Sequence, residues 1–190
     1  MKFDIHVHTN HSDGVVSPED VVKQAAKVVD GLAITDHDTM SGIAKAKRAA
    51  KKYGVIFIPG VEITTPMGDI LAVGVEEMPK TDDILEVFAA IHKQGGVAVL
   101  AHPFAGSFQI SFTDIIEILK GKFDAIEIYN SSTPMPANME AARMAKKTGM
   151  VGVAGSDAHF LEVIGTAYTI SDDSDIVNAI KKGNVKVGWV

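Results

Sequence analysis

Hydrophobic residues along the chain follow two alternating spacings. Short apolar runs of strand length alternate with longer segments in which apolar residues recur every three to four positions, as on one face of a helix. This order predicts parallel strands joined by helical crossovers, and so an α/β fold. The predicted strands lie at residues 3–8, 31–35, 55–59, 69–75, 97–101, 124–129, 150–154, 165–170 and 185–189. The predicted helices lie at 41–53, 84–94, 112–120 and 135–148, with two more capped by Ser17 and near Ser171 or Asp172.

About seven such units can close into a barrel or remain an open, doubly wound sheet. An open sheet that binds dinucleotides carries a glycine-rich loop after its first strand. Here that turn, residues 8–14, reads His-Thr-Asn-His-Ser-Asp-Gly, which is not such a loop. The sequence therefore favours a barrel. No linker, charge block or repeat interrupts residues 1–190, so we expect a single domain.

Composition narrows the possible functions. The 190 residues include no cysteine, which excludes disulfides, thiolate metal sites and a cysteine nucleophile. Eighteen basic against 24 acidic residues give a net charge of −6, which argues against a general nucleic-acid-binding surface. No apolar stretch approaches the roughly 18 residues of a membrane span, and the N-terminus has no signal-like apolar region. We therefore expect a cytoplasmic protein without a membrane partner, whose oligomeric state is unknown.

Histidine and acidic residues gather where the predicted strands end. In α/β barrels the reacting groups come from the carboxyl ends of several strands and from the loops that follow them. A chance collection of turn and capping residues is the alternative, but five of the seven histidines occupy such positions. The residues at strand ends are His6, His8, Asp13, Asp36, His37, Glu62, His102, Glu127, Asn130, Asp157 and His159.

The spacing of these residues indicates a metal centre. His6 and His8 are two positions apart on a strand, so their side chains point to the same face and can share one cation. Imidazole nitrogen combined with carboxylate oxygen, without sulfur, suits Zn²⁺, Mn²⁺ or Fe²⁺. A single His-x-His pair is weak support, whereas the whole set predicts that several strand ends meet around bound metal.

Five short motifs resemble those of the PHP (polymerase and histidinol phosphatase) family, and they occur in the family's order over residues 6–159. They are His6-Val7-His8 with Ser12-Asp13-Gly14, Thr35-Asp36-His37-Asp38, Gly60-Val61-Glu62, Ala101-His102-Pro103 and Gly155-Ser156-Asp157-Ala158-His159. The resemblance implies a distorted (β/α)7 barrel, a trinuclear metal cluster and phosphoester hydrolysis. It implies one metal held by His6, His8, Glu62 and Asp157, and a second held by Asp13, His37 and His159. A third would be held by Glu62, His102 and one further residue.

That further residue departs from the family's pattern. The family often has a histidine on the strand after the glutamate motif, but residues 68–74 contain none. Asp69 is the nearest replacement, either as a ligand or as an ordinary turn residue. The departure leaves two or three metal ions possible, and an oxygen-rich third site would accept Mn²⁺ or Mg²⁺ more readily.

These observations predict a metal-dependent phosphoesterase. We expect a metal-bridging hydroxide to attack a phosphomonoester or a terminal nucleotide phosphoester, so the partner is a small phosphorylated substrate or a short nucleotide end. Asp36 is interpreted as a proton-handling carboxylate or a loop cap, and Glu127 as a residue at the rim or behind the ligands. His11, Asn130 and Arg143 are candidate substrate contacts. The alternatives are a non-catalytic, metal-stabilised binding module and an amidohydrolase-like hydrolase.

Overall fold

The computed structural model describes residues 1–105 and 112–190. Within these ranges, nine strands form one sheet in the order β7-β6-β5-β4-β3-β2-β1-β8-β9. The strands are β1 (Lys2–Asp4), β2 (Gly31–Ile34), β3 (Ile56–Thr65), β4 (Gly68–Val73), β5 (Val97–Leu100), β6 (Ala125–Asn130), β7 (Val151–Gly155), β8 (Ala167–Ile170) and β9 (Lys186–Trp189). The α-helices are α1 (Pro18–Ala25), α2 (Ile43–Tyr53), α3 (Ile84–Lys93), α4 (Phe112–Leu119), α5 (Met135–Thr148) and α6 (Ile176–Lys181).

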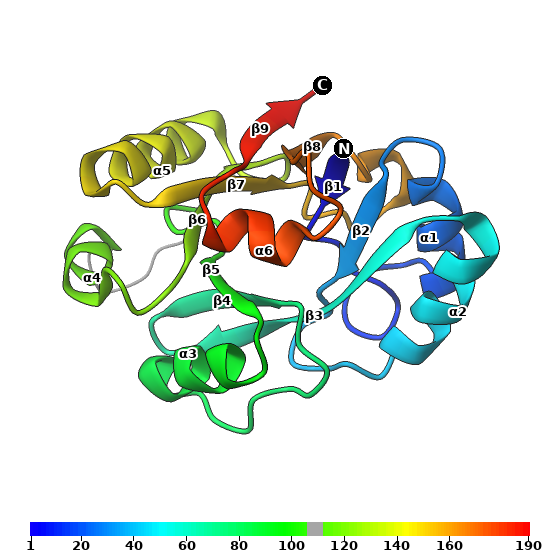
Figure 1. The fold of residues 1–190 in the computed structure, drawn as a ribbon, viewed down its shortest axis with the longest axis horizontal. Helices are drawn as coiled ribbons and strands as arrows, with labels where there is room; N and C mark the ends of the chain where they lie inside the picture. Colours follow the sequence, from blue (N-terminus) through cyan, green and yellow to red (C-terminus); the bar gives the residue numbers. More distant parts are fainter. Residues whose placement is uncertain (106–111) are drawn as a thin grey trace.

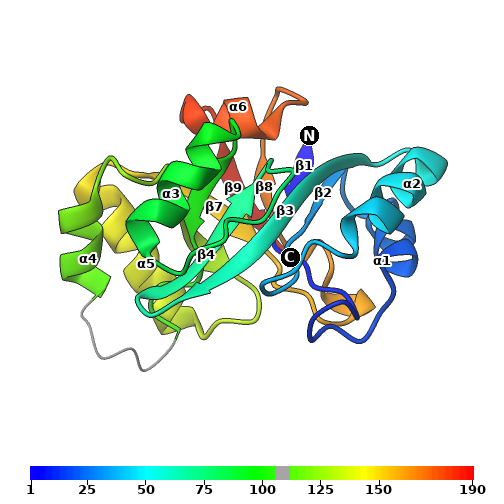
Figure 2. The same cartoon turned by 90° about the horizontal axis from the view of Figure 1, so that it is seen from below.

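Helices surround the sheet (Figure 1). Helices α1 and α2 lie together on one side, α4 and α5 lie on the opposite side, and Figure 2 shows α6 across one end. Three buried apolar clusters hold these layers together, and α6 adds Ile176 and Ile180 to the cluster that contains Phe3 and Val97. None of the helices in the described ranges has both the length and the apolar character needed to cross a membrane.

The barrel class is confirmed, but the expectation that all strands run parallel is wrong. Strand β4 is antiparallel to both β3 and β5, and β8 is antiparallel to both β1 and β9. The turn between β3 and β4 explains the first reversal. Residues 66 and 67 alone connect the two strands, and a parallel pair needs a crossover of a dozen residues or more. The remaining pairs, β1–β2, β2–β3, β5–β6 and β6–β7, are parallel.

Most predicted helix boundaries agree with the structure. Ser17 caps α1, accepting a hydrogen bond from the Asp20 backbone N–H, and α5 has the predicted bounds. The prediction that a helix is capped near Ser171 or Asp172 is wrong. The side chain of Ser171 accepts the Asp173 N–H within a turn, and Asp175 caps α6 by accepting the Asn178 N–H.

Backbone hydrogen bonds nearly close the sheet where β1 and β7 end. The His8 N–H donates to the Ala158 carbonyl (2.9 Å), and the Asp157 N–H donates to the His6 carbonyl (2.8 Å). Strand β1 is shorter than the predicted residues 3–8 because the chain beyond it leaves the regular ladder and pairs with residues 157–158. This seam places residues about 150 positions apart in direct contact.

Asp4 holds the seam from the interior. It is fully buried, and its carboxylate accepts three hydrogen bonds of 2.6 to 2.9 Å from the Ser156 N–H, the Ser156 hydroxyl and the Gly165 N–H. A single side chain thus satisfies polar groups after β7 and before β8 that have no access to water.

We expect Asp4→Ala to lower the free energy of unfolding by about 2–5 kcal/mol, because several buried donors lose their acceptor. Urea unfolding of the purified protein measures the change. Asp30→Ala is the matched control, since Asp30 is exposed and its carboxylate accepts only the Lys2 N–H among the described hydrogen bonds. Equal losses in the two variants would contradict the role assigned to Asp4.

Candidate metal centre

The residues predicted at strand ends meet at one end of the barrel. His6 and His8 follow β1 at the seam, His37 follows β2, Glu62 lies on β3, His102 follows β5, and Asp157 and His159 follow β7. A bridge between His37 and Glu62 continues the pairing of β2 with β3. The convergence therefore follows from strand pairing, because neighbouring strand ends lie about 5 Å apart.

Three overlapping groups of side chains each place their nitrogen and oxygen atoms within 4.8 Å of one another. They are His8 with Asp13, His37 and His159, then His6 with His8 and Asp157, and finally His6 with Glu62 and His102. This arrangement shares more residues than the sets implied by the resemblance. His8 also belongs with the second set, and His6 also belongs with the third.

The deepest part of the centre pairs two buried imidazoles with two carboxylates. His8 Nε2 lies 3.2 Å from Glu62 Oε2 and 3.1 Å from Asp157 Oδ1. His6 Nε2 lies 3.1 Å from the same Glu62 oxygen and 3.4 Å from Asp157 Oδ1. Both imidazoles and Glu62 have no side-chain exposure, so solvent cannot balance their charges.

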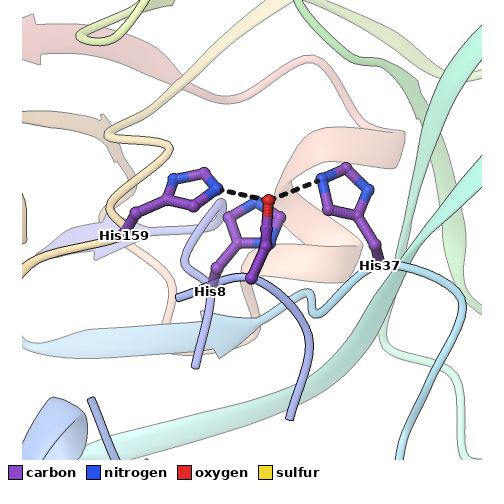
Figure 3. A group of neighbouring side chains, drawn as sticks. His8, His37 and His159 are labelled. Carbon is purple, nitrogen blue, oxygen red and sulfur yellow. Dashed lines mark hydrogen bonds and ion pairs between the residues drawn. The ribbon is translucent and has the colours of Figure 1, made fainter. Parts of the chain in front are cut away.

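The outer part of the centre is open to solvent. Figure 3 shows the rings of His159 and His37 on either side of His8, with dashed lines from both meeting at one oxygen atom. This oxygen is Asp13 Oδ2, 3.0 Å from His159 Nε2 and 3.7 Å from His37 Nε2. The side chain of Asp13 is 53% exposed, and those of His37 and His159 are 33% and 27% exposed.

Asp69 lies beside the third group but outside it. His102 Nε2 is 3.1 Å from Glu62 Oε1, whereas Asp69 belongs to none of the three groups. Asp69 is on β4 opposite Thr64, and burial and the nearby Glu62 carboxylate raise the pKa of its side chain. Asp69 is thus close enough to sense the charge of Glu62, and its part in binding metal stays a prediction.

Charge in the centre is balanced between carboxylates and imidazoles. Burial raises the pKa of Glu62, but the charge of His6 and hydrogen bonds with neighbouring imidazoles outweigh it and hold that pKa well below its usual range. Burial alone lowers the pKa of His8, but the carboxylates of Asp157 and Glu62 outweigh it and raise the pKa to about 9. Without a cation, the carboxylates therefore keep His8 protonated at neutral pH.

Bound divalent metal fits this set of residues. Both ring nitrogens of His8 are buried and neither makes a hydrogen bond of good geometry, although the Asp157 and Glu62 carboxylates lie within 3.2 Å of Nε2. A buried nitrogen without a well-formed hydrogen bond is costly in a folded protein unless something else, such as a cation, binds it. Nitrogen and oxygen donors without sulfur are the ligands of Zn²⁺, Mn²⁺ and Fe²⁺.

Two residues in the centre have unusual backbone conformations. His102 and Asp157 have φ angles of +27° and +53°, in the region that favours glycine. Each lies two residues beyond the end of a strand, His102 after β5 and Asp157 after β7. The chain turns sharply at these positions and carries each side chain into the centre.

The contacts of Asp36 favour its interpretation as a loop cap. It is buried, and its carboxylate accepts the Thr9 N–H, the Thr9 hydroxyl and the Ser12 hydroxyl at 2.6 to 2.9 Å. These bonds fix the loop that carries Asp13. His11, on the same loop, has Nδ1 2.6 Å from the Ser41 hydroxyl and Nε2 3.3 Å from Lys45 Nζ.

The two other candidate substrate contacts differ in position. Asn130 is buried and donates to Asp157 Oδ2 at 3.2 Å, so it belongs to the centre. Arg143 pairs with Glu140 on the same helix and contacts Met144, and no described contact joins it to the centre. The sequence analysis placed Glu127 at the rim or behind the ligands, and the structure places it behind them, with its side chain fully buried against His6. The sequence signal for the position of Glu127 was its place within a predicted strand, three residues before Asn130.

Family descriptions match nearly the whole chain. A PHP domain matches residues 4–134, and a PHP-associated region matches residues 136–185. The chain belongs to the PHP domain family. This PHP protein is 46% identical over 173 residues to the 5'-3' exoribonuclease Rnm of Salmonella typhimurium, covering 90% of this chain and 51% of that protein. It is 40% identical over 67 residues to a 3',5'-nucleoside bisphosphate phosphatase of Chromobacterium violaceum, covering 35% of this chain and 24% of that protein.

A crystal structure gives the same fold. A two-domain protein from Bacteroides vulgatus, described as containing a predicted PHP-like metal-dependent phosphoesterase, superposes with a TM-score of 0.82 at 20% identity. The superposition covers 100% of this chain and 64% of that one. This chain thus spans only part of each of these three proteins.

We expect the affinity for Mn²⁺ to rise between about pH 6 and about pH 8.5. His8 is protonated in the metal-free protein and must release its proton to bind metal, so acid competes with the cation. Each proton released contributes up to about tenfold per pH unit. Calorimetric titration in buffers of different ionisation heats counts these protons, and an affinity independent of pH would contradict the expectation.

Proposed function

We propose that this PHP protein is a metal-dependent phosphoesterase that hydrolyses a phosphomonoester or the terminal phosphoester of a nucleotide. The observation that carries the proposal is the set of three overlapping groups of donor atoms, which includes His8 with two buried nitrogens that make no well-formed hydrogen bond. Membership of the PHP family, with its phosphatase and exoribonuclease relatives, supports the same chemistry.

Two or three divalent ions, Zn²⁺, Mn²⁺ or Fe²⁺ and with Mg²⁺ as a further candidate, are the proposed cofactors. His6, His8 and Asp157 would hold one ion, and Asp13, His37 and His159 a second. Glu62 and His102 would hold a third, with Asp69 the candidate for completing it. Such ions supply a water of lowered pKa and positive charge for the oxygens of a phosphate.

The burial of the site residues determines the side from which a substrate approaches. Because His6, His8 and Glu62 are buried while Asp13, His37 and His159 are partly exposed, the substrate approaches from the side of the exposed residues. Asp36 holds the Asp13 loop through Thr9 and Ser12. The side chain of Asp13 therefore stays between His37 and His159 when the substrate binds.

The net charge of −6 gives no general attraction for a nucleic acid, so the proposed substrate is small or the end of a short chain. His11 is proposed to contact the substrate. It lies on the loop that carries Asp13, and its side chain is next to that of Lys45. We propose that residues 1–190 act as one domain and that the setting is the cytoplasm.

We expect His8→Ala to lower kcat/KM on an aryl phosphate by about 10³-fold or more, because loss of a bound metal removes several kcal/mol of transition-state stabilisation. A chelator should have the same effect on the wild-type protein. His92→Ala is the matched control, since His92 is exposed and pairs with Asp124 outside the three groups. Full activity in a folded His8→Ala protein would contradict the proposal. Metal binding without any hydrolysis would favour the binding-module alternative.

A panel of substrates tests which type of ester the protein hydrolyses. We expect metal-dependent release of phosphate or of a terminal nucleotide from an aryl phosphate, a nucleoside 3',5'-bisphosphate or a short 5'-phosphorylated oligonucleotide. Reaction products separated by chromatography identify the cleaved bond. Hydrolysis of amides or carboxylic esters, with none of these phosphoesters cleaved, would support the amidohydrolase-like alternative instead.

A further inference from the structure

Glu127 lies behind the metal centre rather than at its rim. It is on β6, fully buried, and both of its carboxylate oxygens are used. Oε1 is 3.0 Å from His6 Nδ1, while Oε2 accepts the His102 backbone N–H at 2.9 Å and the Asn130 side-chain amide at 3.0 Å. The Glu127 carboxylate therefore contacts two candidate metal ligands, His6 and His102. It also contacts Asn130, which in turn contacts a further candidate ligand, Asp157.

The contact with His6 decides which nitrogen of that ring can bind metal. A carboxylate accepts hydrogen bonds and donates none, so Glu127 keeps a proton on Nδ1. A neutral imidazole carries only one proton, which leaves the lone pair of Nε2 free. Nε2 faces Glu62 and Asp157, the carboxylates of the centre.

The second oxygen of Glu127 secures the other side of the centre. His102 has a φ angle of +27°, which few residues other than glycine adopt, and its N–H is held by Glu127. Asn130 donates to Glu127 and also to Asp157 Oδ2, which leaves Asp157 Oδ1 directed at His6 and His8. The orientations of His6, His102 and Asp157 thus depend on one buried side chain.

His159 offers an internal comparison. Its Nδ1 lies 3.0 Å from the Asp157 carbonyl oxygen, and its Nε2 faces Asp13. A carbonyl, like a carboxylate, only accepts, so it selects the same tautomer. Among the described hydrogen bonds, His6 is the imidazole of the centre whose Nδ1 is bonded to a buried carboxylate.

We propose that Glu127 is a positioning residue that fixes the Nδ1–H tautomer of His6 and the backbone of His102, and so sets the metal affinity of the centre. The proposal rests on the metal centre of the proposed function, and it assigns Glu127 no contact with substrate. Outer partners of this kind typically change metal affinity by about 10- to 100-fold when they are lost.

Glutamine at position 127 tests the tautomer directly because it has nearly the same shape but only one oxygen. If that oxygen faces His102 and Asn130, the amide NH₂ points at His6 Nδ1 and moves the ring proton to Nε2. If the amide is flipped, two donors at His102 and Asn130 lose their acceptor. Either orientation disturbs a candidate ligand.

The experiment compares the wild-type protein with Glu127→Gln and with Glu117→Gln. Glu117 is half exposed and pairs with Lys147 on the outer surface, so it controls for loss of a carboxylate alone. Titration with Zn²⁺ alone gives affinity and ions bound per chain, and urea unfolding of the metal-free proteins checks the fold. We expect Glu127→Gln to bind Zn²⁺ about 10- to 100-fold more weakly and Glu117→Gln to match the wild type. A folded Glu127→Gln protein with wild-type zinc affinity would overturn the proposal.

A measurement on the wild-type protein covers the case in which the variant does not fold. Long-range ¹H–¹⁵N spectra of the zinc-loaded protein should show His6 protonated at Nδ1 and bound to metal through Nε2. Coordination through Nδ1 would overturn the role of Glu127 while leaving the proposed function intact. Failure of the wild-type protein to bind Zn²⁺ or Mn²⁺ would overturn the metal centre itself.

Discussion

The backbone hydrogen bonds between residues 6–8 and residues 157–158 are the constraint on which the site depends. They bring the end of β1 against the chain leaving β7, and they place His6 and His8 within 3.4 Å of the Asp157 carboxylate. Asp4 strengthens the same seam from inside the barrel. The interaction that closes the sheet is therefore also the one that assembles the deepest part of the centre, and fold and site cannot be varied independently there.

Burial divides the centre into two parts with different physical demands. The inner residues, His6, His8 and Glu62, are shielded from water, so their charges must be balanced by one another or by bound cations. The outer residues, Asp13 among them, are partly hydrated, and Asp36 holds the loop that carries Asp13. The inner side of the site is therefore closed to solvent, and the outer side is accessible to it.

Sequence reasoning succeeded where a residue's role follows from local pattern. The helix cap at Ser17 and the positions of His6 and His37 at strand ends could be predicted, because capping and strand alternation are local rules. The antiparallel course of β4 was missed because an apolar strand reads the same in either direction. The sequence left Glu127 either at the rim or behind the ligands, since its distance from His6 depends on how β6 packs across the barrel rather than on any local pattern. The grouping of His8 with both Asp13 and Asp157 likewise depends on the closed shape of the sheet.

The left-handed backbone at His102 and Asp157 has a wider consequence. Conformations of this kind cost on the order of 1–3 kcal/mol for a residue with a side chain, and glycine relieves that cost. Glycine, however, offers no imidazole or carboxylate. Foldability and chemistry therefore pull in opposite directions at the same two positions. A library of variants selected for heat resistance alone would accumulate glycine at both positions and lose the centre. A library selected for turnover would retain His102 and Asp157 despite their strained backbone.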